Sequence, residues 1–281
     1  MPELTDPRLT APDGQPTPFQ VTAGVAAIRA APAPDAEMVT QALHGETLQV
    51  FSETGEFGQV QLDRDRYVGW VLMEAVSAPA LSASHRVGAL RTYVYSEPDL
   101  KSAPHYLVSL NARMVVEPEQ EGRFVKCARS GWVVADHLAP LDVWEPDPAS
   151  VAERFVGTPY LWGGRESLGL DCTGLTVAAF GACGVDLPRD SDMQFAWAGA
   201  PIDDWDRPGV LHRGDLVFWK GHVGILTDDQ TLIHANAHHM CVARESLSAA
   251  IERIAPLYGP PIGARRLNVT AARGHGPDWL S

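Results

Sequence analysis

The stretch P-Y-L-W-G-G-R-E-S-L-G-L-D-C-T-G, residues 159–174, decides the fold of the C-terminal half of the chain. Asp171 and Cys172 stand directly before the small, apolar run LTVAAFGAC at 175–183. This run predicts a buried helix that stops at Gly184. Cys172 is therefore expected where a loop enters a helix, and the unpaired N–H groups and the helix dipole there would lower the pKa of its thiol. Such a cysteine is either a nucleophile or a small buried hydrophobe.

Two histidines follow on strand-like runs. His222 lies in GDLVFWKGHVGIL and His234 lies in LIHA. If residues 228–230 form a three-residue turn, Gly224 faces His234. The two imidazoles are then diagonal neighbours on one face of a sheet, roughly 7–8 Å apart at the backbone, and Gly224 leaves room beside the His234 ring. A two-residue turn would put the histidines on opposite faces.

These segments resemble the NlpC/P60 family of papain-like cysteine peptidases, which cleave bacterial cell-wall peptides. The matching motifs, in the family's order, are 160–164, 171–174, 188–194, 214–218, 222–225 and 233–235. The resemblance implies an α+β catalytic domain over 143–270. It implies that Cys172 is the nucleophile, that His222 takes its proton and that His234 orients the His222 ring. Tyr160 either donates a hydrogen bond to the oxyanion or packs under the glycine turn.

The segment P-R-D-S-D-M-Q at 188–194 matches the branch of the family that acts on murein peptides in the cytoplasm. In that branch the aspartate pairs with the free α-amine of an N-terminal L-Ala. We therefore expect Asp190 to bind an ammonium group. Ser191 precedes Gln194 at the spacing of a capping box, so Ser191 can cap a helix while Asp190 binds the substrate.

The other candidate substrate-binding residues come from both halves of the chain. Asp171 and Trp162 belong to the opening stretch. In the same branch, the first small all-β domain on the N-terminal side of the catalytic domain closes one end of the groove with a tyrosine and an acidic residue. Tyr67, just before G-W-V, matches the tyrosine position. Glu37 is the expected acidic partner, and Glu46 is the alternative.

The N-terminal half carries an internal repeat. Short β-type runs broken by turn residues fill 21–76 and return over 87–141, and each series closes on Gly-Trp-Val, at 69–71 and 131–133. The repeat predicts two small all-β barrels and resembles bacterial SH3 (SH3b) domains. The predicted domains are a loose arm at 1–16, SH3b-like domains at 17–80 and 81–142, the catalytic domain at 143–270 and a tail at 271–281.

Inside the catalytic domain, helices are expected before strands. The first helix, 151–157, would be capped by Ser150 or Asp147. A second helix follows Cys172, and a third spans 191–197. The expected strands are 215–219, 222–227, 231–236, 240–244 and 262–267.

Composition excludes several classes of protein. The chain has 281 residues, a net charge of −13 and a hydrophobic share of 45%, which indicate a globular protein of two or three domains. The negative charge argues against binding to nucleic acid or to anionic membranes. The first residues lack the pattern of a signal peptide, and the four cysteines form no C-x-x-C pair. We expect a cytoplasmic, monomeric protein.

One competing constellation is a metal site. His234, His238, His239 and Cys241 lie within eight residues of one another. On a strand, His234 and His238 share a face, whereas Cys241 and His239 point the other way. The set has no recognised zinc spacing. We expect neither a metal nor an organic cofactor.

The resemblance implies hydrolysis of the γ-D-glutamyl bond to a diamino acid, usually meso-diaminopimelate, in small murein peptides with a free L-Ala. Recycling of such peptides is the expected role. The alternatives are a secreted endopeptidase that acts on intact peptidoglycan and a non-catalytic murein-binding protein on the same scaffold.

Overall fold

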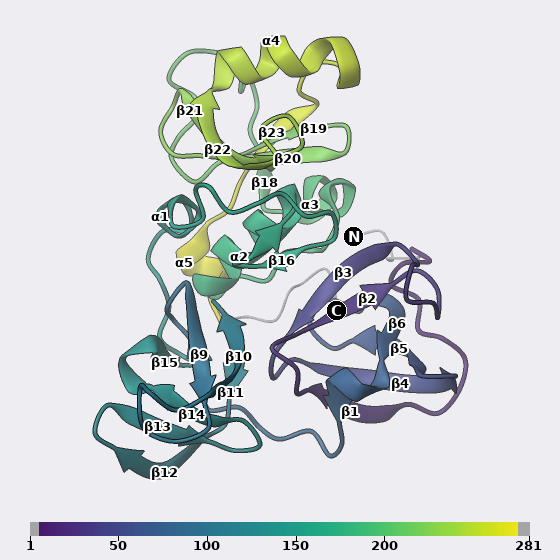
Figure 1. The fold of residues 1–281 in the computed structure, drawn as a ribbon. Helices are drawn as coiled ribbons and strands as arrows, with labels where there is room; N and C mark the ends of the chain where they lie inside the picture. The colour runs from purple at the N-terminus through teal and green to yellow at the C-terminus, as the bar shows by residue number, and fades with distance from the viewer. Residues whose placement is uncertain (1–5, 275–281) are drawn as a thin grey trace. The chain divides into compact units, whose positions relative to one another are not determined.

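The computed structural model describes residues 6–274 and divides into two units, Met1–Val143 and Trp144–Ser281 (Figure 1). The N-terminal unit consists of strands and short turns, and the C-terminal unit mixes helices with strands. Within residues 6–274, no helix combines the length and the apolar character needed to cross a membrane.

The first half of the N-terminal unit is one antiparallel sheet of seven strands in the order β3-β2-β6-β5-β4-β1-β7. Alternate residues are buried in β2 and in the first half of β4, as the period of two in a half-buried strand requires. The strands are β1 Thr17–Val21, β2 Val25–Arg29, β3 Met38–Leu43, β4 Thr47–Thr54, β5 Phe57–Leu62, β6 Val68–Leu72 and β7 Val76–Ser77, with a 3-10 turn at Met73–Ala75.

The second half has two sheets, ordered β10-β9-β14-β13-β12 and β11-β8-β15. The Gly-Trp-Val triplets lie in β6 and β14, and a 3-10 turn and a short strand follow each of them. The two halves therefore repeat one order of strands, and the assignment of the second half to an SH3b domain stays a prediction. Its strands are β8 His85–Val87, β9 Arg91–Tyr95, β10 Pro104–Ser109, β11 Arg113–Met114, β12 Val116–Glu121, β13 Phe124–Cys127, β14 Gly131–Val134 and β15 Leu138–Pro140, with a 3-10 turn at Ala135–His137.

The expected loose arm is wrong for the residues from Asp6 to Leu9. Leu9 is buried, and its carbonyl accepts a hydrogen bond from Gln61 Nε2 at 2.9 Å. The Arg8 carbonyl accepts one from Val68 N at 2.8 Å. This segment is thus fixed to β5 and β6 by hydrogen bonds that composition alone does not predict.

The C-terminal unit is built on a six-stranded antiparallel sheet in the order β18-β23-β19-β20-β21-β22. Its strands are β18 Ala200–Pro201, β19 Leu216–Trp219, β20 His222–Leu226, β21 Thr231–Asn236, β22 Cys241–Ser246 and β23 Gly263–Arg266. A separate ribbon pairs β16 Arg165–Glu166 with β17 Gly169–Leu170. The helices are α1 Pro148–Glu153, α2 Cys172–Ala182, α3 Ser191–Trp197, α4 Leu247–Tyr258 and α5 Val269–Ala272.

Helix α2 is the buried helix that its sequence predicts. Every residue of α2 except Gly181 is buried, which is typical of a helix that is apolar on all sides. The helix packs against β20 and β21. Gly184 follows it with φ +80°, a conformation that glycine adopts at little cost. Of the two proposed caps of α1, Asp147 is the one that accepts hydrogen bonds from the first turn.

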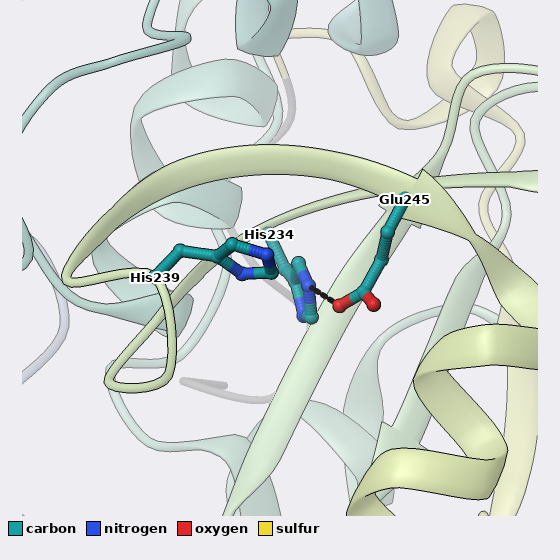
Figure 2. Close-up of side chains that lie close together, drawn as sticks. All are labelled: His234, His239 and Glu245. Atoms are coloured by element: carbon teal, nitrogen blue, oxygen red, sulfur yellow. Dashed lines mark hydrogen bonds and ion pairs between the residues drawn. The ribbon is translucent and has the colours of Figure 1, made fainter.

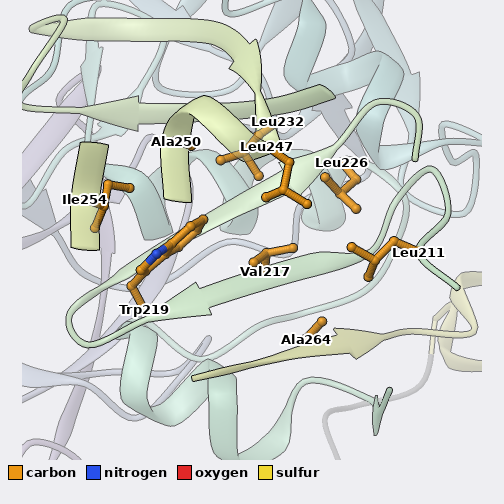
Figure 3. Close-up of a cluster of buried hydrophobic side chains, with 9 residues drawn as sticks. All are labelled: Leu211, Val217, Trp219, Leu226, Leu232, Leu247, Ala250, Ile254 and Ala264. Atoms are coloured by element: carbon orange, nitrogen blue, oxygen red, sulfur yellow. The ribbon is translucent and has the colours of Figure 1, made fainter. Parts of the chain in front are cut away.

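Helix α4 was not expected, so the order of helices before strands is incomplete. Ser246 caps α4 by accepting a hydrogen bond from Ala249 N at 3.2 Å. Its apolar residues at spacings of three and four, Leu247, Ala250 and Ile254, pack against the sheet (Figure 3). The full cluster consists of Leu211, Val217, Trp219, Leu226, Leu232, Leu247, Ala250, Ile254 and Ala264.

The predicted C-terminal tail is docked as far as residue 274. Arg273 donates hydrogen bonds to the carbonyls of Cys183 and Glu145 at 3.1 and 3.0 Å. Gly274 N donates one to the Gly184 carbonyl at 2.9 Å. The rest of the tail, with Trp279, lies outside the described residues.

Candidate active site

The glycines of the opening stretch let its loop lie directly on the first turn of α2. Gly163 has φ +76°, in the region that favours glycine, and its N–H donates to Asp171 Oδ2 at 2.9 Å. A Cβ on Gly164 would meet the Gly169 carbonyl oxygen at 2.5 Å, and one on Gly174 would meet the Gly164 carbonyl oxygen at 2.0 Å. Gly163 is thus required for its positive φ, and Gly164 is required for the close approach of the two backbones.

Asp171 holds this arrangement together rather than pointing to a ligand, which corrects the expectation that it binds substrate. Its Oδ1 accepts from Gly174 N at 2.7 Å and caps α2. Arg189 Nη2 donates to Oδ2 at 2.6 Å and Nη1 to Oδ1 at 3.1 Å. The Thr173 hydroxyl adds a bond of 3.0 Å. Both oxygens are thus occupied in a buried ion pair, and sequence reasoning missed Arg189 as its partner.

Cys172 is the first residue of α2 and is 9% exposed. Burial raises the pKa of its thiol to about 12, and the charge of Asp171 adds to this rise. Hydrogen bonds from the Val223 and Thr173 amides and the charge of Arg189 act in the opposite direction but do not prevail. The expected lowering of the thiol pKa is therefore wrong, because the loss of solvation outweighs the helix terminus.

The two histidines meet as the three-residue turn predicts. Thr227 N bonds to the Thr231 carbonyl at 2.9 Å, and Ile225 pairs with Ile233. This register brings His222 and His234 to one face, with a distance of 2.8 Å between His222 Nε2 and His234 Nδ1. The Val223 amide that bonds to the Cys172 sulfur directly follows His222, so the thiol lies beside this pair.

Leu232 is the nearest neighbour of Gly224. A Cβ there would meet Cδ1 and Cγ of Leu232 at 2.6 and 2.8 Å. Leu232 thus lies nearest to this glycine, and the room beside the His234 ring stays a prediction. Gly224 thus serves the packing of the sheet, and the hydrogen bond between the histidines holds the rings.

Both imidazoles are kept neutral. Burial lowers the pKa of His222 to about 3, and the neighbouring His234 contributes to this shift. Burial also lowers the pKa of His234, although the hydrogen bond to Glu245 opposes it. With a neutral imidazole and an un-ionised thiol, the resting site holds a general base and a proton donor rather than an ion pair.

Glu245, on β22, extends the pair into a chain of four groups that ends at Arg253, and Figure 2 shows its contact between His234 and Glu245. His234 Nε2 lies 2.7 Å from Glu245 Oε1. Arg253 of α4 donates to the same carboxylate, through Nη2 to Oε1 and through Nε to Oε2. These contacts lower the pKa of Glu245 to about 2 against the effect of burial. The sequence analysis missed Glu245 and Arg253. The Ser246 cap and the apolar periodicity of 247–254 could have predicted helix α4, which carries Arg253.

A metal site is the alternative use of this cluster. His234, His239 and Glu245 bring potential ligand atoms within 4.8 Å of one another, a set different from the one considered from sequence (Figure 2). Both nitrogens of His234 already take part in hydrogen bonds, and Glu245 already holds the Arg253 cation. His239 Nδ1 bonds to Asn236 Oδ1 at 2.9 Å. The donor set therefore suits a hydrogen-bond chain better than a cation.

Tyr160 lies within electrostatic reach of the nucleophile. Burial raises the pKa of its hydroxyl, and the charges of Cys172 and Asp171 add to this rise. Tyr160 therefore stays a hydrogen-bond donor at neutral pH, as an oxyanion contact requires. Trp162 is 60% exposed and presents an aromatic surface on the same loop. The roles of both residues stay predictions.

Asp190 and Ser191 begin helix α3, but not as a capping box. The N-cap residue is Asp190, and its side chain makes no capping hydrogen bond within the described chain. Gln194, the expected partner of Ser191, is buried instead and bonds to the Thr176 hydroxyl and the Pro188 carbonyl, both at 2.8 Å. Ser191 is partly exposed at the first helical position. The Asp190 carboxylate is therefore not used as a cap, and its role in binding ligand stays a prediction.

Tyr67, Glu37 and Glu46 lie in the N-terminal unit. Tyr67 is buried, and its backbone N–H donates to Asp65 Oδ1 at 3.1 Å. Glu46 is buried in a turn, where its carboxylate accepts from Leu43 N at 3.0 Å. Glu37 is exposed. Of the two acids, Glu37 is thus the one that water and ligands reach, and its pairing with Tyr67 at a substrate stays a prediction.

Comparison with known families agrees with this site. Residues 157–253 match the NlpC/P60 family, and residues 28–76 match the family described as the bacterial dipeptidyl-peptidase Sh3 domain. The chain thus carries an NlpC/P60 domain preceded by an SH3-type domain. The first match covers the cysteine, both histidines and Glu245.

Individual relatives also carry the names of peptidases or of the NlpC/P60 family. Dipeptidyl-peptidase 6 of Lysinibacillus sphaericus is 27% identical over 77% of this chain and 86% of its own length. The γ-D-glutamyl-L-lysine dipeptidyl-peptidase of Bacillus subtilis is 38% identical over 29% of this chain and 28% of its own length. The crystal structure of an NlpC/P60 family protein from Bacillus cereus shares the fold, with a TM-score of 0.74 at 21% identity over 89% of this chain and 99% of that one. The family match and these names support a peptidoglycan-related peptidase.

Proposed function

We propose that the chain is a cysteine peptidase that hydrolyses the γ-D-glutamyl bond to a diamino acid in small murein peptides with a free N-terminal L-Ala. The observation that carries the chemistry is the contact of 2.8 Å between His222 and His234, next to the amide that bonds to the Cys172 sulfur. A nucleophile, a base and a group that orients the base are the parts that acyl transfer needs.

The pKa shifts of Cys172 and His222 indicate which group carries the proton before the first step. The Cys172 thiol is un-ionised and the His222 ring is neutral in the resting site. The thiol proton therefore moves to His222 as the sulfur attacks the carbonyl carbon, and it later passes to the leaving amine. The Cys172 N–H, at the start of α2, and the Tyr160 hydroxyl are the donors that we assign to the oxyanion.

Asp190 supports the substrate end of the proposal. The ion pair between Arg189 and Asp171 joins the segment of Asp190 to the residue before the nucleophile, at 2.6 Å. A carboxylate at this place suits the α-ammonium of L-Ala. The Bacillus subtilis relative is named for a γ-D-glutamyl-L-lysine bond, so lysine and meso-diaminopimelate are the two diamino acids to compare. Recycling of such peptides in the cytoplasm is the role that we propose.

The proposal is tested with L-Ala-γ-D-Glu-diamino acid tripeptides, read by mass spectrometry. The tripeptide with a free amine should be cut about a hundredfold faster in kcat/KM than its N-acetyl form, because acetylation strands the Asp190 carboxylate. Asp190→Ala should remove most of this difference, whereas Asp192→Ala, two residues along the same helix, should keep it. Cys172→Ala should abolish turnover, with Cys241→Ala as the matched cysteine control. Turnover retained in Cys172→Ala would exclude the cysteine mechanism.

A further inference from the structure

Glu245 stands behind the two histidines, and no part of the proposed reaction uses it so far. Its side chain is 14% exposed and lies between His234 Nε2 at 2.7 Å and the Arg253 guanidinium. Arg253 comes from α4, so the carboxylate is held by a helix on one side and an imidazole on the other. A buried carboxylate with this pair of partners is ionised and accepts hydrogen bonds without donating any.

The Glu245 carboxylate determines which ring nitrogens of His234 and His222 carry a proton. Because Glu245 only accepts, His234 carries its proton on Nε2. A neutral His234 then has a bare Nδ1, which accepts the hydrogen bond of 2.8 Å from His222 Nε2. His222 is thereby protonated on Nε2 and bare on Nδ1. The reverse set of tautomers would place a bare nitrogen of His234 against the carboxylate, so it is disfavoured.

The bare nitrogen of His222 is the ring nitrogen that is not occupied by His234. Nδ1 is bonded to the ring carbon that joins the side chain to the backbone. The Cys172 sulfur accepts a hydrogen bond from the amide of Val223, the next residue along that backbone. The sulfur thus lies beside the backbone that carries the His222 ring, and we assign Nδ1 as its proton acceptor because Nε2 is taken by His234.

We infer that Glu245 is a positioning residue of the active site, which acts through His234 to fix the tautomers of both imidazoles so that His222 presents a basic nitrogen to Cys172. This inference rests on the proposed cysteine-peptidase chemistry. In the step that it serves, one proton leaves the Cys172 sulfur and joins His222 Nδ1 as the sulfur–carbon bond forms. The protons on both Nε2 atoms stay in place, and the carboxylate balances the positive charge on the rings.

The test reads the ring protons directly. Histidine ring nitrogens of the full chain, labelled with ¹⁵N, are compared by NMR at pH 7 in the wild type, Glu245→Ala, Glu245→Gln and Glu252→Gln. Glu252 is the exposed neighbour of Arg253 on α4 and controls for the change in charge. The wild type and Glu252→Gln should show His222 and His234 protonated on Nε2, and Glu245→Ala should show a mixture of tautomers. Glu245→Gln keeps an oxygen acceptor and should keep the wild-type tautomers.

Turnover of the tripeptide gives the second readout. Glu245→Ala should lower kcat about 10- to 100-fold with KM within about twofold, and Glu245→Gln should fall in between. Wild-type tautomers in Glu245→Ala would overturn the inference, as would an unchanged kcat. If Glu245→Ala fails to fold, Glu245→Met fills the same volume and gives the same comparison. The NMR readout needs no substrate, so an error in the proposed substrate would leave it intact.

Discussion

Cys172 combines two opposing influences on one thiol. Its place at the start of α2 favours the thiolate, whereas burial raises its pKa to about 12. We expect iodoacetamide to label Cys172 slowly at pH 7 and faster at each step up to pH 10, since only the thiolate reacts. Peptide mapping by mass spectrometry measures the rate, with the more exposed Cys241 as an internal comparison. A labelling rate of Cys172 that is already constant below pH 8 would show that the helix terminus dominates.

His222 links the active site to stability at acid pH. Its pKa is about 3 in the folded protein, against an ordinary value of 6.5. Between these values the unfolded chain binds a proton that the folded chain does not, so stability is full above pH 6.5 and falls as the pH drops toward 3. His222→Gln should flatten the fall in melting temperature between pH 6.5 and 4.5, above the range in which Glu245 titrates. An equally steep fall in this variant would show that His222 is not held neutral.

At the scale of elements, the ion pair of Arg189 and Asp171 joins the start of α3 to the start of α2. Its side chains are 2% and 7% exposed. Arg189→Met should lower the free energy of unfolding by about 3–5 kcal/mol, because a buried carboxylate loses its partner. Adding Asp171→Asn should recover part of the loss, since asparagine also caps a helix. Urea unfolding measures both, and a loss below about 1 kcal/mol would contradict this account.

Helix α4 adds a function that its own sequence does not reveal. It covers the sheet with Leu247, Ala250 and Ile254, and it also delivers Arg253 to Glu245 on β22. The same helix therefore packs the core and holds the carboxylate behind the histidines. A change in the packing of α4 is expected to reach the active site through this contact.

At the scale of the whole molecule, the proposed recognition of a free L-Ala limits the length of substrate. A peptide still attached to glycan has no free amine for the Asp190 carboxylate to bind. Free tripeptide should thus be cut at least about a hundredfold faster than intact sacculi, by release of products read by mass spectrometry. Asp190→Ala should reduce the difference in rate between free tripeptide and sacculi. Sacculi digested as readily as tripeptide would instead favour a secreted wall endopeptidase.

The sequence by itself determined the features that depend on neighbouring residues. A small apolar run after Cys172 predicted the buried helix, whereas the run between the two histidines left two turn lengths open, and the structure has the three-residue turn that joins His222 to His234. Helix and strand periods are local properties, so they can be read from a chain without its fold, whereas the length of a turn depends on how the strands pair.

Only the tertiary structure decided the chemistry around these elements. Arg189 meets Asp171 across 18 residues, and Arg253 reaches Glu245 from a different element. The raised pKa of Cys172 likewise follows from burial. Solvent exclusion and contacts between distant segments depend on how the helices pack on the sheet, and no local pattern carries that information.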